Sequence, residues 1–173
     1  MDIIQGIKRA IGIITLNSAV IKETSRDKNA TGVTLLIWMF IPVAASIGTW
    51  SLRNIIPGIF VWTAVLGIGT AIYHILAQIL GGKATYQQLL RPLGHQGVLY
   101  WVMIIPGIGP ALSVVAMFWS IVIDIVTLKI VYKLSTARAA AVVLIPASII
   151  ITLVATFFAV IVAFMLAMIG KNI

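Results

Sequence analysis

The feature that most restricts the fold of this chain is a set of long segments without charge. No Asp, Glu, Lys or Arg occurs in the four segments 29–52, 54–82, 92–123 and 139–170. A helix needs about 20 apolar residues to cross the hydrocarbon core of a bilayer. Only 9% of all residues are charged, against about 25% in a soluble domain. We therefore expect an integral membrane protein whose outer surface is covered mainly by lipid.

The third of these segments holds a strong helix breaker. Two prolines and two glycines lie within the five residues Pro106-Gly107-Ile108-Gly109-Pro110, and this composition predicts a tight turn. The turn divides the segment in two, and the part before it is short for a full crossing. Either that part extends back to Arg91, or the turn lies slightly inside the membrane. The chain is thus predicted to be an all-α polytopic bundle of about five transmembrane helices, at about 31–52, 55–80, 92–106, 110–132 and 139–169.

The first 28 residues are predicted to form a separate cytoplasmic segment before a membrane domain at 29–173. Ile3, Ile4, Ile7, Ile11 and Ile14 recur at helical spacing, which indicates an amphipathic helix lying among the lipid headgroups. The alternative is a short helix packed on the loops of the protein itself.

The basic residues set the expected orientation. With the N-terminus in the cytoplasm, five spans place ten of the 12 Lys and Arg residues inside and leave Arg53 and Lys171 outside. Cytoplasmic loops of membrane proteins are enriched in Lys and Arg in this way. The net charge of +8 then indicates contact with anionic lipid headgroups rather than nucleic acid. We expect a multi-pass protein of the cell membrane, or of an endomembrane in a eukaryote, with an external C-terminus.

Ionisable and polar residues inside apolar segments are costly and are therefore candidates for function. The candidate polar cluster consists of His74, Gln78, His95, Asp124 and Lys129. Asp124 either pairs with Lys129 or Arg91 at the cytoplasmic boundary, or forms a proton or cation site. His74, His95 and Asp124 have suitable ligand atoms, but their spacing matches no metal motif. We predict no metal site.

The sequence carries no pattern of residues typical of an enzyme. It has no paired carboxylates, no HExxH motif, no phosphate-binding loop with its lysine and no nucleophile elbow. Gly81-Gly82 reads as a helix stop after the second span. The chain has no cysteine, which excludes disulfides and thiolate ligands. We expect a protein without catalytic residues or cofactors.

Three stretches resemble the Yip family, small five-span membrane proteins that interact with Ypt and Rab GTPases. They are the Gly81-Gly82 loop with Arg91, the Pro106 to Pro110 turn, and Leu134-Ser135 followed by Arg138-Ala139. The resemblance implies a cytoplasmic N-terminal tail and a short external C-terminus. Eukaryotic members act in vesicle trafficking, but this chain lacks their long N-terminal region and their Asp-Leu-Tyr-Gly-Pro type of motif. It is similar to the short prokaryotic branch, so the GTPase role is not carried over.

Two functions are compatible with these observations. The first is a non-enzymatic membrane scaffold, adaptor or membrane-organising protein, with an unidentified protein or a second copy of the chain as partner. The alternative is a small transporter or channel that uses Asp124 and His74 as a proton or cation site.

Overall fold

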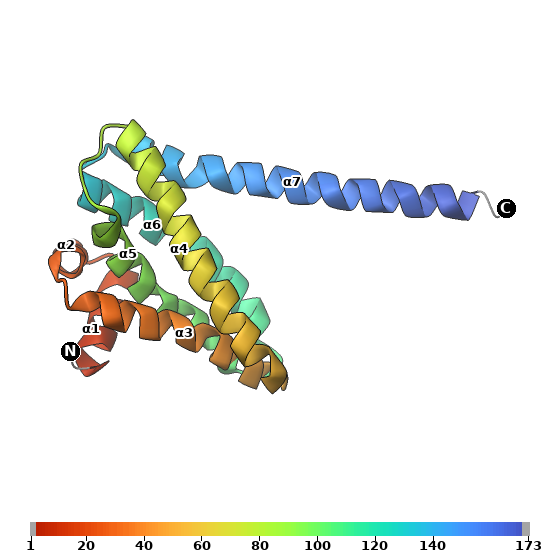
Figure 1. Ribbon diagram of the computed structural model, residues 1–173, viewed down its shortest axis with the longest axis horizontal. Helices are drawn as coiled ribbons and strands as arrows, with labels where there is room; N and C mark the ends of the chain where they lie inside the picture. Colours follow the sequence, from red (N-terminus) through yellow and green to blue (C-terminus); the bar gives the residue numbers. More distant parts are fainter. Residues whose placement is uncertain (1–2, 171–173) are drawn as a thin grey trace.

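The fold is known from a computed structural model, which describes residues 3–170 (Figure 1). All regular elements within this range are helical. In chain order they are α1 (Ile3–Ile14), α2 (Ser18–Arg26), α3 (Ala30–Gly48), the 3₁₀ helix η1 (Leu52–Asn54), α4 (Ile55–Ile79), α5 (Tyr86–His95), the 3₁₀ helix η2 (Gln96–Ile104), α6 (Gly109–Tyr132) and α7 (Thr136–Gly170).

Four helices in the described range are long and apolar enough to cross a membrane. They correspond to α3, the η1–α4 segment, α6 and the first 29 residues of α7. Their positions follow four of the five predicted spans closely. The Gly81 stop and the Pro106 turn both occur where the sequence predicts them. Gly81 has a φ of +93° and Gly107 a φ of +80°, a backbone conformation that glycine adopts without steric cost.

The predicted third span, 92–106, is not one continuous α-helix. Its first residues belong to α5, which begins after a capping box formed by Thr85 and Gln88 and contains Pro92. From Gln96 the chain continues as η2. A 3₁₀ helix rises about 2.0 Å per residue, more than an α-helix does. The nine residues of η2 therefore cover about 18 Å, which is longer than an α-helix of the same number of residues.

The helix ends gather in two groups at opposite ends of the molecule. The end of α3 and the start of α6 both lie against the end of η2, where Gly48 and Gly109 face the Met103 carbonyl. At the other end, the Arg138 Nη1 of α7 donates to the Leu80 carbonyl after α4, at 3.2 Å. Helices α4 and α6 consequently run in the same direction, and α5 with η2 returns the chain from one end of the molecule to the other (Figure 1).

Helix α7 projects away from the other helices over most of its length (Figure 1). Its first turns are packed, with Ala139, Val142 and Val143 buried. The helix continues through Pro146, and the apolar side chains between that residue and Phe164 are largely exposed. Such a surface requires an apolar environment. Lys171, assigned to the outer side in the charge count, lies outside the described residues.

Helix α1 packs on the protein by one face and leaves three of the five isoleucines of its predicted lipid-facing side exposed. Gly6, Arg9, Ala10 and Ile13 are buried, whereas three of the isoleucines, Ile3, Ile4 and Ile11, are exposed. The reason is close packing, because Gly6 lies against the Val33 side chain with no room for a Cβ atom. The small residues Gly6 and Ala10 therefore face α3, and these three isoleucines project outward.

Candidate functional site

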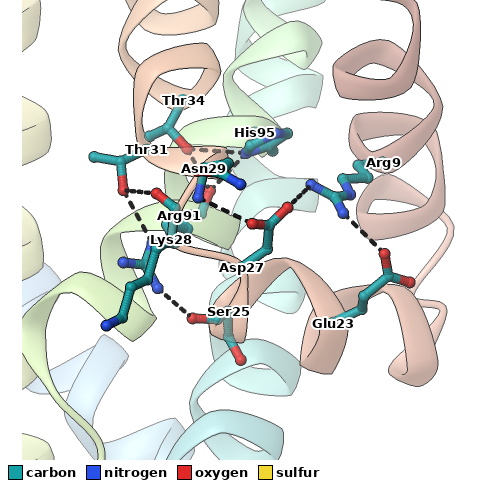
Figure 2. A network of polar contacts seen from close by, with 10 residues as sticks. All are labelled: Arg9, Glu23, Ser25, Asp27, Lys28, Asn29, Thr31, Thr34, Arg91 and His95. Atoms are coloured by element: carbon teal, nitrogen blue, oxygen red, sulfur yellow. Dashed lines mark hydrogen bonds and ion pairs between the residues drawn. The ribbon is translucent and has the colours of Figure 1, made fainter. Parts of the chain in front are cut away.

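Two ion pairs hold α1 against the end of α2, and both use the same arginine (Figure 2). Arg9 Nη1 donates to Asp27 Oδ2 at 2.6 Å, and Arg9 Nη2 donates to Glu23 Oε1 at 2.9 Å. The Arg9 residue is 8% exposed. The hydrogen bond from Arg9, helped by the backbone N–H of Asn29, holds the pKa of Asp27 below its usual range. This pairing fixes the two N-terminal helices to each other.

A second buried arginine joins this N-terminal region to α5. Arg91, only 4% exposed, donates to the Ser25 carbonyl at 2.8 Å, to Thr31 Oγ1 at 3.0 Å and to Gln87 Oε1 at 3.2 Å. Its partners thus come from α2, α3 and α5, and Figure 2 shows the first two, Ser25 and Thr31. Neutral oxygens that accept from a buried guanidinium compensate for its loss of water. Arg91 therefore ties the N-terminal helices to the membrane helices.

His95 completes this network instead of joining a site inside the apolar segments. It is fully buried, and its Nδ1 lies 3.0 Å from Thr34 Oγ1 and 2.8 Å from the Arg91 carbonyl oxygen. Helices α5 and α3 approach each other closely at this point, because Gly94 packs against Thr34 with no room for a side chain. The position of His95 is thus explained by the packing of α5 on α3.

Asp124 lies in a different place, inside the span formed by α6. Its Oδ1 accepts a hydrogen bond from Gln96 Nε2 at 2.6 Å, and the Tyr73 hydroxyl also interacts with this carboxylate. The pairing with Lys129 or Arg91, one of the two predicted alternatives for Asp124, is not found among the described residues. Lys129 is exposed and sits five positions further along α6, which turns it about 140° away around the helix, while Arg91 is occupied by its own partners.

His74 contacts neither Asp124 nor His95. Its Nδ1 lies 2.6 Å from the Tyr132 hydroxyl, and its ring meets the Tyr86 ring edge to face at 6.1 Å. Gln78 and Lys129 are both exposed. The five candidate polar residues are therefore spread over separate environments. In the described part of the chain, no three His, Asp or Glu side chains gather in a way that could hold a metal ion.

Sequence reasoning missed the residues that surround Asp124. Gln96 is a polar residue inside the uncharged segment 92–123, so the argument applied to Asp124 could have identified it. Tyr73 gives no comparable signal, because tyrosine is common in buried apolar helices.

The comparison with protein families gives one clear result. The Yip1 domain model matches residues 11–159, which is most of the chain. The chain belongs to the Yip1 domain family. The family resemblance predicted from three short stretches is thereby confirmed. No curated protein and no solved structure matches the chain.

The motif residues that first indicated the Yip family lie at both ends of the helices. At one end the Gly81-Gly82 loop packs on the loop after α6: Gly82 lies against the Tyr132 ring, and Arg138 reaches back to Leu80. There Leu134 and Ala139 are buried, and Ser135 Oγ accepts from the Arg138 N–H at 3.4 Å. The turn from Pro106 to Pro110 lies at the opposite end. Most of the stretches that first indicated the resemblance therefore lie in the connections between helices.

Proposed function

We propose that this Yip-family membrane protein is a non-enzymatic membrane-organising scaffold that acts through its N-terminal helix. The observation that carries the proposal is the division of α1 into two faces. Its inner face is packed on the protein, while Ile3, Ile4 and Ile11 remain 63%, 62% and 54% exposed. A fixed helix with an outward row of large apolar side chains inserts between lipids as a wedge.

The place of α1 along the membrane helices supports this proposal. The Trp119 Nε1 of α6 donates to the Ile14 carbonyl at 3.0 Å, and Trp119 lies inside a candidate membrane span. Ala10 packs with Val33 and Ile37 of α3. A helix in contact with two spans has lipid as its outer neighbour, and the exposed Lys8 is suited to anionic headgroups.

We also propose that the protein lies in the cell membrane, crosses it five times and has its N-terminus in the cytoplasm. The parallel course of α4 and α6 supports a crossing by α5 and η2 between them. The basic residues support the orientation, because Lys83, Lys133 and Arg138 lie at one end of these helices and Arg53 lies at the other. The tendency of basic loops to stay in the cytoplasm is strongest when the loops are short, as they are here.

The test is deformation of liposomes by the purified full-length protein. Reconstituted into vesicles containing anionic phospholipid, the wild type should produce tubules or small vesicles in electron micrographs. Ile4→Ser with Ile11→Ser should lose most of this effect while retaining the helical circular-dichroism spectrum. The matched control is Gln5→Ser, a substitution at another exposed position of α1. Equal deformation by the double variant and the control contradicts the proposed wedge.

A further inference from the structure

A cavity of about 150 Å³ lies between α4, α6 and the α5–η2 segment. Its wall combines polar and aromatic side chains with a few apolar ones. The residues that carry the argument are Trp38, Thr70, Tyr73, Gln96, Tyr100 and Asp124. Val65 also lines it and is 52% exposed, so the cavity opens toward the outer surface of α4.

Among the residues that the structure describes, no cation pairs with the carboxylate in this cavity. Asp124 is 8% exposed, and the groups that interact with it, Gln96 and Tyr73, are both neutral. The two ion pairs within the described residues both belong to Arg9. A buried carboxylate is costly unless a positive charge or several hydrogen bonds compensate for it. The cavity therefore favours a positively charged ligand.

Two further oxygens of the cavity wall lack a hydrogen-bond partner among the described residues. They are Thr70 Oγ1 and Gln96 Oε1, and their residues are 1% and 5% exposed. Buried polar atoms are normally paired, so unpaired ones need an explanation. Gln96 uses its N–H on Asp124, which leaves its oxygen as an acceptor. Together with the carboxylate these atoms give the lining three groups that can accept hydrogen bonds, although the Thr70 hydroxyl can also donate one.

Aromatic rings border the same space. The Trp38 and Tyr100 rings meet edge to face, with their centroids 6.5 Å apart, and Trp62 packs against both. The electron-rich faces of such rings attract organic cations. A bare alkali ion would use the oxygens but would leave most of a 150 Å³ cavity unfilled.

We propose that this cavity is a binding site for a small organic cation that carries an ammonium group. A primary ammonium has three N–H donors, which match the carboxylate of Asp124 and the unpaired oxygens of Thr70 and Gln96. The carbon chain of the ligand lies against Trp38 and Tyr100. This site is separate from the exposed face of α1, so it holds or fails independently of the proposed scaffold function.

The test uses the full-length protein in detergent, with ethanolamine at neutral pH as the probe. Binding is followed by calorimetry and by the fluorescence of tryptophan, since Trp38 lines the cavity. We expect saturable binding of ethanolamine, and weaker binding of both sodium ion and ethylene glycol, a neutral molecule of similar size. Asp124→Asn should raise the Kd at least about tenfold, because a charge-assisted contact is lost.

Two more variants keep the test decisive. Thr70→Val preserves the shape of the side chain and removes only the hydroxyl, so it should fold normally and raise the Kd several-fold. Glu23→Gln removes a surface carboxylate and should leave the Kd unchanged. The proposal is overturned if no probe binds, if sodium ion binds more tightly than ethanolamine, or if Thr70→Val and Asp124→Asn both bind like the wild type.

Discussion

The two buried arginines that hold the N-terminal helices in place have different chemical surroundings. Arg9 is paired with two carboxylates, Glu23 and Asp27, whereas the hydrogen-bond acceptors of Arg91 are neutral oxygens of Ser25, Thr31 and Gln87. The Arg9 contacts therefore depend on the ionisation of acids, and the Arg91 contacts do not. At the scale of single residues, acid should therefore weaken the contacts of Arg9 and leave those of Arg91 intact.

We predict that acid weakens the attachment of α1 to α2. The folded-state pKa of Asp27 lies below its unfolded value, so its stabilising effect is complete above the ordinary aspartate pKa and is lost as pH falls through the folded pKa. Protease cleavage within residues 1–28 should therefore increase steeply below about pH 4.

The control for this prediction is Asp27→Asn, which keeps the size of the side chain. It should raise cleavage at neutral pH and remove most of the acid dependence. If the wild type and Asp27→Asn show the same pH profile, Asp27 is not the group that holds α1 in place.

At the scale of elements, close backbone approach determines how the helices meet. Gly48 at the end of α3 faces the Met103 carbonyl of η2, and Gly94 of α5 faces Thr34 of α3. A side chain at either position would push the helices apart. Small residues permit such contacts between membrane helices, where packing replaces the hydrophobic effect as the driving force.

We predict that Gly48→Ala lowers the free energy of unfolding in detergent by about 1–3 kcal/mol, because the added Cβ atom overlaps the Met103 carbonyl. Gly32→Ala in the same helix is the matched control. A Cβ atom at Gly32 meets no atom within 4 Å, so alanine there should be neutral or stabilising by up to about 1 kcal/mol. Similar effects of the two substitutions would argue against the described α3–η2 contact.

At the scale of the whole molecule, the path of the chain supports the five crossings that we propose. Helices α4 and α6 run in the same direction, so the segment between them must return across the molecule. The broken α5–η2 segment provides this return, although it does not have the length and apolar composition of a transmembrane α-helix. The projecting helix α7 then exposes apolar surface suited to the lipid bilayer.

Single-cysteine labelling tests this topology directly, because the chain contains no cysteine of its own. In intact cells, a membrane-impermeant maleimide should label Arg53→Cys and Ile108→Cys and should spare Lys83→Cys and Lys133→Cys. Permeabilised cells provide the control for reactivity. A four-crossing topology predicts the opposite result at two sites, with Ile108→Cys protected and Lys133→Cys labelled.

The sequence alone determined the features that depend on neighbouring residues. Uncharged apolar segments determine where long helices occur, and glycine and proline determine where they stop, as at Gly81 and at Pro106–Pro110. These effects act within a few residues of the chain. The family resemblance was visible for the same reason, since the stretches that carry it are the short loops between the helices.

The tertiary structure decided the features that depend on residues far apart in the chain. Arg91 finds its partner Ser25, and Asp124 finds Gln96, only after the helices have packed. The packed face of α1 depends on its close approach to Val33, where Gly6 leaves no room for a Cβ atom. Hydropathy is nearly uniform around the long helices α3, α4, α6 and α7, so their sequence pattern does not specify which side faces the protein. That choice follows from steric fit and from the pairing of a few buried polar groups.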